Sequence, residues 1–389
     1  MIVGLSLGLQ FTHAQKNKKE DKQPLDEITI SGLKWRNIGP SLTSGRISDI
    51  AVNPNNPFEY YVASSSGGVW KTTNAGNHYT PIFDGQGSYS IGCVTIDPNN
   101  TNVIWVGTGE NNNQRSVSYG DGVYKSIDGG QSWKHMGLKN SEHIGKIIVH
   151  PDDSNIIYVA AIGPLWSKGG DRGLYKSTDG GEKWEAVLTI DEHTGVTDLV
   201  MDPRDPDVLY AATLQRRRHV YTYVGGGPGS GLHKTTDGGK TWQKVENGLP
   251  KTELGRIGLA ISPANPEIIY AIVEAAEGKS GFFKSINRGA SWEKQSNHVT
   301  SGNYYQEIIA DPIDENTVYS MDTWMSATRD GGKTFNMVGE VTKHVDNHSI
   351  WIDPNDNKHW LVGCDGGIYE TFDAANNWDF KENLPVTQF

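Results

Sequence analysis

The sequence is poor in three features, and each shortage argues against a class of protein. Its 389 residues include two cysteines, too few for a disulfide framework. Cys93 and Cys364 both lie in apolar, strand-like runs, which predicts two buried thiols. No run approaches the roughly 20 apolar residues of a membrane helix, so we expect no transmembrane segment. Positive charge is also scarce: 35 Lys and Arg against 46 Asp and Glu leave a net charge of −11. This balance argues against a nucleic-acid or anionic-membrane partner.

The N-terminal stretch "MIVGLSLGLQFTHAQ" has an apolar run with no Lys or Arg before it, then small residues around Thr12 and Ala14. This pattern is typical of the end of a secretory signal peptide whose basic start is missing. A disordered apolar leader is the alternative. "KNKKEDKQP" follows with the composition of a charged linker. We therefore predict a truncated signal peptide and linker over residues 1–24 and a folded domain over residues 25–389. We also predict a secreted, periplasmic or cell-surface protein.

What the sequence does contain is internal repetition. The phrase "KSIDGGQSW" from Lys125 returns as "KSTDGGEKW" from Lys176 and "KTTDGGKTW" from Lys234, with four looser copies. Its central Asp or Asn falls at positions 74, 128, 179, 237, 287, 330 and 373. A second phrase alternates with it, also seven times. That phrase is an apolar strand, a turn containing Pro, and a strand rich in Ile, Val, Tyr and Trp, as in "VTIDPNNTNVIWVG".

Each repeat therefore contains four strands, two around the Pro turn and two around the repeated phrase. Four strands in every 43 to 58 residues are typical of a propeller blade. The sequence thus predicts an all-β fold, a seven-bladed β-propeller with four-stranded antiparallel blades. In the repeated phrase, Gly129 and Gly130 suit the positive φ angles of a hairpin tip. Asp128 can accept hydrogen bonds from turn amides, and Trp133 can pack against a neighbouring blade.

The spacing S/T-x-D-x-G-x-x-W resembles the Asp-box, or BNR, repeat, in which these turns are structural and lie away from the active site. Over residues 33–389, "LKWRNIGPSLTSGRISDIAVNP", "GTGENNNQRS" and "HVDNHSIWIDP" resemble secreted bacterial proteins described as glycosyl-hydrolase-like or sortilin-N-terminal-like. The wider relatives are xyloglucanase-type glycoside hydrolases, the VPS10 propeller of sortilins and photosystem II assembly factors. The resemblance implies that a further C-terminal propeller follows this chain. It also implies that "LKWRNIGP" pairs with a strand there or closes the ring. We expect no cofactor.

Blade topology places the Pro turns and the repeated hairpin tips on one face, here called the turn face. The longest connections lie on the opposite, long-loop face: Glu110–Gly122, Gly163–Gly173 and Leu214–Gly231. Long loops on a rigid scaffold are where binding usually occurs. These loops carry aromatic rings that can stack on a sugar or grip a peptide, and arginines that can reach an acidic group: Tyr119, Trp166, Tyr221, Tyr223, Arg216, Arg217 and Arg218. Packing of the loops on one another is the alternative.

The inner strands direct polar side chains toward the same face. Counting back four residues from the one before each turn Pro selects one position per blade: Asp49, Cys93, Lys146, Asp198, Gly258, Glu307 and Ser349. We interpret the four charged members, Asp49, Lys146, Asp198 and Glu307, as a polar ligand site at the mouth of the channel. Solvated residues at the strand entries are the alternative.

The stretch "KHVDNHSIW" places His344, Asp346 and His348 at every second position. On a strand these side chains point the same way, and two imidazoles with a carboxylate could bind a divalent metal. No fourth ligand is evident, and a loop before the strand would break the alternation. Hydrogen bonding to a ligand and a purely structural role are the alternatives, and we predict no metal site.

The xyloglucanase resemblance implies two carboxylates, an acid and a base, on either side of the scissile bond. In those enzymes one Asp ends the second strand of the first blade, where this chain has "SSSGGVW" (Ser64–Trp70) without a carboxylate. Asp365 and Glu110 occupy the analogous places in blades seven and two and are the catalytic candidates. Because the blade-one Asp is missing, the sequence favours a propeller that binds an extended glycan or peptide across its long-loop face. A glycoside hydrolase acting on β-glucans is the alternative.

Overall fold

The computed structural model describes residues 43–387, which lie within one compact unit, Pro40–Phe389. The predicted signal peptide, the linker and "LKWRNIGP" lie outside the described residues. Every regular element in residues 43–387 is a strand, so this part of the chain has no helix that could cross a membrane.

The strands form seven antiparallel sheets, each built from consecutive segments of the chain. Blades 1 and 2 consist of β1 (Ile47–Val52), β2 (Tyr60–Ser64), β3 (Gly68–Thr72), β4 (Thr80–Pro81), β5 (Ile91–Ile96), β6 (Ile104–Thr108), β7 (Val123–Ser126) and β8 (Lys134–His135). Blades 3 and 4 consist of β9 (Ile144–His150), β10 (Asp153–Ala161), β11 (Gly173–Ser177), β12 (Glu185–Leu188), β13 (Thr194–Asp202), β14 (Asp205–Arg218), β15 (Tyr223–Gly225), β16 (Gly231–Thr235) and β17 (Gln243–Val245). Blades 5 to 7 consist of β18 (Leu254–Ile261), β19 (Ile269–Ala275), β20 (Gly281–Ser285), β21 (Glu293–Ser296), β22 (Ile308–Ala310), β23 (Val318–Ser320), β24 (Ser326–Thr328), β25 (Asn336–Met337), β26 (Asn347–Asp353), β27 (Asp356–Cys364), β28 (Gly367–Thr371) and β29 (Asp379–Phe380).

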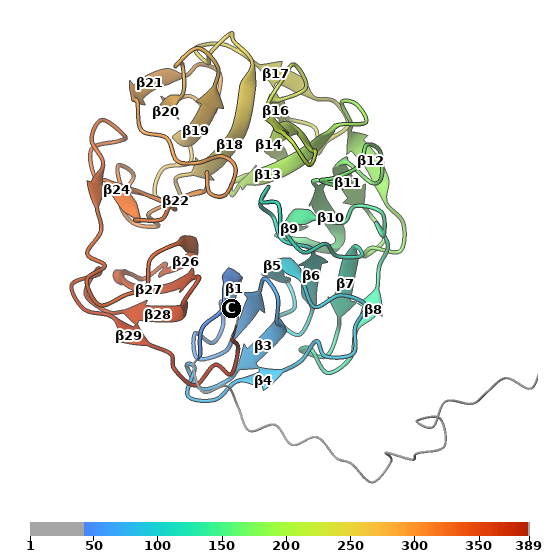
Figure 1. Cartoon of the computed structure of the whole chain (residues 1–389), viewed down its shortest axis with the longest axis vertical. Coiled ribbons are helices and arrows are strands. Elements are labelled where there is room, and N and C mark those ends of the chain that lie inside the picture. The colour runs from blue at the N-terminus through green and yellow to red at the C-terminus, as the bar shows by residue number, and fades with distance from the viewer. Residues whose placement is uncertain (1–42, 388–389) are drawn as a thin grey trace, which may run out of the picture. The chain divides into compact units, whose positions relative to one another are not determined.

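The blades of this unit surround a central channel, and the first strand of each blade lines it (Figure 1). Blades 1 and 7 meet directly: Ile47 and Tyr60 of blade 1 pack with Leu361 and Ile368 of blade 7 and with Leu384. The ring therefore closes within the described residues, and the predicted seven-bladed all-β propeller is confirmed.

Blade 4 departs from the four-stranded pattern. Its second strand β14 pairs with β16 through Leu209–Thr213, and its far end, Arg216–Arg218, pairs with the extra strand β15. The β14–β15 hairpin thus extends blade 4 on the long-loop face.

Burial on both faces explains the composition of the second strands. β2 and β6 are buried along their whole length. Trp105, Tyr158 and Tyr210 from blades 2 to 4 lie in the apolar layers between adjacent blades. A residue on either face of such a strand meets a neighbouring blade, so period-two alternation of polar and apolar residues is absent.

The repeated phrase forms the same hydrogen-bonded turn in every blade. In blade 2, the Ser126 hydroxyl donates to Asp128 Oδ1 at 2.7 Å and accepts the Gly130 amide at 2.8 Å. Asp128 Oδ1 also accepts the Ser132 amide at 2.9 Å. Hydrogen bonds from Ser132 and Ser126 lower the pKa of Asp128 to about 2. The equivalent hydroxyl–Asp or hydroxyl–Asn pairs occur at Thr72/Asn74, Ser177/Asp179, Thr235/Asp237, Ser285/Asn287, Thr328/Asp330 and Thr371/Asp373.

The ends of the phrase in blade 2 join that blade to its two neighbours. Lys125 of blade 2 donates to the Gly180 carbonyl in the turn of blade 3 at 3.0 Å. The indole of Trp133 donates to the Ile82 carbonyl of blade 1 at 2.6 Å, which confirms that this Trp packs against a neighbouring blade. The repeated Lys and Trp are therefore part of the scaffold.

Candidate functional site

β-bulges in the inner strands turn additional side chains toward the channel. The pairing register shifts between Ile47 and Asp49 in blade 1, and the same shift occurs in blades 2, 4 and 7. A bulge inserts one extra residue and re-aims the side chains around it. Two adjacent residues of these strands, such as Ser48 and Asp49, therefore line the channel.

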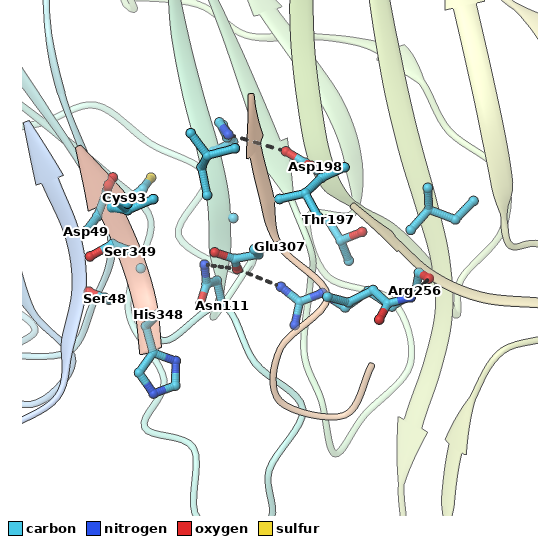
Figure 2. A pocket seen from close by; sticks show the side chains of 18 residues that line it. Ser48, Asp49, Cys93, Asn111, Thr197, Asp198, Arg256, Glu307, His348 and Ser349 are labelled. Atoms are coloured by element: carbon cyan, nitrogen blue, oxygen red, sulfur yellow. Dashed lines mark hydrogen bonds and ion pairs between the residues drawn. The ribbon is translucent and has the colours of Figure 1, made fainter. Parts of the chain in front are cut away.

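The channel contains a cavity of about 160 Å³, here called the chamber. The structure brings together in its wall all four charged residues that the sequence selected: Asp49, Lys146, Asp198 and Glu307 (Figure 2). Cys93 and Ser349 from the same set of positions also line it. The binding role of these residues stays a prediction.

Gly258 occupies the matching position in blade 5 but adds no side chain. A Cβ there would lie 2.1 Å from the Gln306 carbonyl oxygen of the next blade, so the close approach requires glycine. The neighbouring Arg256 and Ile257 line the chamber instead. Sequence reasoning missed Arg256, because the counting rule selects one position per blade and the bulge exposes another.

The two chamber aspartates join neighbouring blades. Asp49 accepts the Ile50 amide and, from blade 2, the Val94 amide, both at 2.9 Å. Asp198 likewise accepts the Leu259 amide of blade 5 at 2.8 Å. Burial raises the pKa of Asp49 to about 6 despite these hydrogen bonds. One role of both carboxylates is therefore to hold adjacent blades in register.

Two basic side chains balance the carboxylates. Lys146 extends into the channel and lies 3.4 Å from Asp198, and the negative charges of Asp198, Glu307 and Asp49 raise its pKa. Arg256 donates to Glu307 at 2.9 Å, and Asn111 donates to the same carboxylate oxygen at 3.1 Å, as the dashed lines in Figure 2 show. The chamber thus combines acidic and basic groups.

A segment of the β6–β7 loop, residues 110–113, crosses the channel on the long-loop side of the chamber; we call it the roof segment. The Asn113 amide donates to the Asn303 carbonyl at 2.9 Å, in the connection between blades 5 and 6. Arg216 donates to the Asn112 carbonyl at 3.1 Å, and Arg218 donates to the Asn113 carbonyl at 2.9 Å. A loop from blade 2 is therefore fixed by groups on the opposite side of the ring.

The predicted ligand-binding arginines have different surroundings. Arg216 is fully buried and holds the roof segment, and burial lowers its pKa to about 9. Arg218 is also buried and lies over the Tyr223 ring, with 4.7 Å between its guanidinium carbon and the ring centroid. Arg217 is half-buried, and its Nε and one terminal nitrogen have no hydrogen-bond partner among the described residues. In this arrangement, Arg216 cannot contact a ligand on the outer surface.

Both catalytic candidates bind one guanidinium beside the roof segment. Arg46 donates to both oxygens of Asp365, at 2.7 and 3.1 Å, and to Glu110 at 2.9 Å. His348 Nε2 contacts Asp365 at 2.8 Å. Burial acts to raise the pKa of Asp365, but the hydrogen bonds and charges of His348 and Arg46 hold it below its usual range. Tyr304 lies against Arg46, with 4.6 Å between guanidinium carbon and ring centroid.

The two carboxylates differ in access. Glu110 is 3% exposed, and its oxygens accept hydrogen bonds from Arg46, Asn112 and the Ser118 amide. The side chain of Asp365 is 31% exposed. Of the two, Asp365 is the one that a substrate on the long-loop face can approach.

His344, Asp346 and His348 do not share a strand face. β26 begins at Asn347, so His344 and Asp346 precede the strand, and Asp346 has a φ of 63°. Asp346 accepts the Tyr305 hydroxyl at 2.6 Å, while His348 turns to Asp365. Among residues 43–387, no three His, Cys, Asp or Glu side chains are grouped so that they could hold a metal ion. A loop precedes the strand and breaks the alternation, which is one of the alternatives that the sequence left open.

A second cavity, of about 580 Å³, opens among the loops of blades 2 and 3; we call it the loop pocket. Tyr119, 72% exposed, forms part of its wall. Trp166, 42% exposed, lies in the chain between the lining residues Pro164 and Ser167. The polar lining comprises Asp121, Lys139, Asn140, Glu142 and Lys168. The predicted aromatic residue Tyr221 lies elsewhere on this face, at the exposed tip of the β14–β15 hairpin.

Both cysteines are buried free thiols, as expected. Burial raises the pKa of Cys364 to about 12 and raises that of Cys93 as well. Neither thiol is therefore activated for nucleophilic chemistry.

Comparisons with known proteins find xyloglucanases among the proteins that are similar to this chain. No protein-family model matches the chain. A xyloglucanase from Paenibacillus sp is 22% identical over 425 residues, and one from Hypocrea jecorina is 21% identical over 437 residues. They cover 91% and 92% of this chain, which spans only 40% and 50% of their lengths.

Solved structures share the fold. The xyloglucanase of family GH74 from Xanthomonas campestris superposes with a TM-score of 0.66 at 15% identity, over 90% of this chain and 56% of that one. YCF48 bound to a D1 peptide superposes with a TM-score of 0.55 at 16% identity, over 88% of this chain and 98% of that one. The chain is thus a β-propeller that is similar in sequence to xyloglucanases and shares its fold with the solved structures above.

Proposed function

We propose that the chain is part of a glycoside hydrolase of the xyloglucanase type, and that its long-loop face binds the β-glucan substrate. Two kinds of evidence support this: the sequence similarity to xyloglucanases over nine-tenths of the chain, and the loop pocket on the face where the sequence predicts a ligand. This proposal reverses the order of the two interpretations drawn from the sequence, in which binding alone was preferred.

The loop pocket is the observation that carries the proposal. A pocket on the turn face, lined by Lys71, Asn74 and Gln131 among others, has the same volume of about 580 Å³. The loop pocket is therefore distinguished by its place among the long loops and by its exposed aromatic ring, not by its size. An exposed aromatic ring such as that of Tyr119 offers an apolar face to a sugar, and the surrounding carboxylates, lysines and amide can bind its hydroxyl groups. Burial raises the pKa of Glu142 above its usual value.

Asp365 is the carboxylate we assign to the chemistry. A general base in glycoside hydrolysis must be ionised, and Arg46 and His348 keep Asp365 in that form. The segment Ser64–Trp70 offers no carboxylate here, since Ser64 and Ser65 are both buried at the position where xyloglucanases are expected to have an Asp. The acid partner of Asp365 is not identified among the described residues, because Glu110 is covered.

A peptide-binding propeller without catalysis is the second candidate. YCF48, which binds a D1 peptide, is matched over 98% of its length. Secretion, the Asp-box assignment of the seven turns, and a further C-terminal propeller remain predictions that go with either candidate.

The test is native affinity electrophoresis in gels containing xyloglucan, mixed-linkage glucan, mannan or pectin, with a reducing-sugar assay on the same mixtures. We expect retardation by xyloglucan and release of sugar ends. Tyr119→Ala should abolish the retardation, whereas Phe58→Ala, an exposed aromatic on the turn face, should not.

Asp365→Asn should lower sugar release by about 10²- to 10⁴-fold with retardation unchanged, because it removes the base and not the binding surface. Asp356→Asn, an exposed carboxylate at the start of β27, is the matched control. Retardation without sugar release by the wild type would favour the non-catalytic binder. If Tyr119→Ala is retarded as strongly as the wild type, the glycan binds somewhere other than the loop pocket.

A further inference from the structure

The single polar site predicted at the channel mouth is divided in two by the roof segment. The chamber lies beneath residues 110–113, with Asn111 in its wall, and the loop pocket lies among the outer loops. Because Arg216, Arg218 and the Asn303 carbonyl fix the roof segment, a chain of sugars on the long-loop face does not reach the chamber. The chamber groups therefore need an explanation of their own.

Two buried polar atoms in the chamber wall lack partners among the described residues. Arg256 is 3% exposed, and although one of its terminal nitrogens binds Glu307, the other has no hydrogen-bond acceptor. Ser349 is 8% exposed, and its hydroxyl has no partner. Buried polar groups are almost always hydrogen-bonded, so both atoms, from blades 5 and 7, call for a polar group in the chamber.

The remaining hydrogen-bonding capacity is of both kinds. Lys146 Nζ has one contact, at 3.4 Å, for three protons. Asp49 binds only two backbone amides, and each carboxylate oxygen can accept a further bond. An anion would face three carboxylates, a cation would face Lys146 and Arg256, and an apolar molecule would leave all of them unpaired. Hydroxyl groups satisfy the whole set, because each one donates to a carboxylate and accepts from a cation.

We infer that the chamber binds one small neutral polyhydroxylated molecule, a polyol or a single sugar, at a site separate from the long-loop face. Its volume of about 160 Å³ suits a molecule of that size. Arg256, Lys146 and Ser349 would donate to its oxygens, and Asp49, Asp198 and Glu307 would accept from its hydroxyls. This inference does not depend on the proposed hydrolase activity.

The test is isothermal titration of the purified chain with D-xylose and with glycerol, using acetate and methylammonium as charged probes. We expect one binding site per chain for D-xylose or glycerol and none for either charged probe. Lys146→Met should weaken this binding at least tenfold. Ser349→Ala should weaken it too, and this second variant is the safer one because the hydroxyl has no other partner to lose. Tyr119→Ala should leave it unchanged.

Three results would overturn the inference: no heat with either neutral probe at millimolar concentration, equal binding in Ser349→Ala and the wild type, or loss of binding in Tyr119→Ala. A crystal soaked in D-xylose gives an independent check, since density for water alone in the chamber would also contradict it. A negative result for the chamber does not predict whether xyloglucan retards the protein, and a negative xyloglucan result does not predict whether the chamber binds D-xylose. The two proposals can therefore fail separately.

Discussion

At the scale of single residues, Asp49 is the most informative side chain in the channel. Two backbone amides stabilise its charged form, but burial disfavours the charge more strongly. The pKa of Asp49 is therefore raised to about 6. Asp365 has the opposite balance, since Arg46 and His348 lower its pKa. Two aspartates of one propeller thus titrate in different pH ranges because their hydrogen-bond donors differ in charge.

We expect Asp49 to make the protein more stable as the pH falls from about 6 to about 4. A carboxyl group with a raised pKa takes up its proton in the folded chain before the unfolded chain does, so protonation favours folding in that interval. The gain is at most about 3 kcal/mol. Urea unfolding measured at a series of pH values tests this.

Asp49→Asn should flatten the profile between pH 6 and 4, because the amide cannot titrate. Asp84→Asn, an exposed loop residue, should leave it as in the wild type. A slope of the opposite sign in this interval would show that Asp49 is not the group that titrates.

At the scale of elements, the seven repeated turns form one kind of joint. Each combines a Ser or Thr hydroxyl with an Asp or Asn acceptor. In blade 2 a Lys also reaches the next blade and a Trp reaches the preceding one. The periodic phrase predicted these turns correctly, since each is built from residues close together in the chain. The inner-strand positions were also predictable in large part, because blades 1, 2, 4 and 7 repeat the bulge at the same distance from the Pro.

The roof segment and Arg256 could not be predicted in this way. Asn113 binds Asn303 and Arg216 binds Asn112 across about 100 to 190 positions of sequence, and no periodicity encodes such contacts. The run "QRRRH" shows that alternate arginines face one way on a strand, but it does not show that they face a loop rather than solvent. Long loops therefore suggested an open binding surface where the structure has a fixed crossing.

Ser126→Ala tests the turns. The alanine removes the acceptor for the Gly130 amide and one donor to Asp128, in a buried position, and we expect a loss of about 1–3 kcal/mol. Thermal and urea unfolding measure it. Ser116→Ala, an exposed serine of the β6–β7 loop, is the control, and an equal effect of both would contradict the structural role.

The same turns predict the acid limit of the fold. The pKa of Asp128, Asp237 and Asp330 is lowered to about 2. Groups with lowered pKa stabilise the folded state above their unfolded value and lose this effect as the pH falls toward the folded value. We expect a cooperative loss of tryptophan fluorescence signal between about pH 4 and pH 2. A fold that is stable to pH 2 would contradict this.

At the scale of the whole molecule, the ring depends on contact between the first and last blades. Within residues 43–387 no strand is exchanged between them, because each blade is built there from consecutive strands. Leu384, 3% exposed, lies in the core that joins them. Leu384→Ala should lower the free energy of unfolding by about 2–5 kcal/mol.

The control for this prediction is Leu249→Ala, at the interface of blades 4 and 5 and similarly buried. Hydrogen exchange in β1 and β27 should accelerate in Leu384→Ala and not in Leu249→Ala, since only the former loosens the first and last blades. Equal exchange in the two variants would show that all blade interfaces open together.

The closure between blades 1 and 7 also decides how the molecule bears mechanical tension. Both ends of the described chain lie at this one interface, where the Ser44 amide donates to the Val386 carbonyl at 3.0 Å. A force that pulls the two ends apart therefore acts on this interface before any other. Because every blade is a continuous stretch of chain, blades then detach one at a time from either end, and pulling should give a series of extension steps, each the length of one repeat.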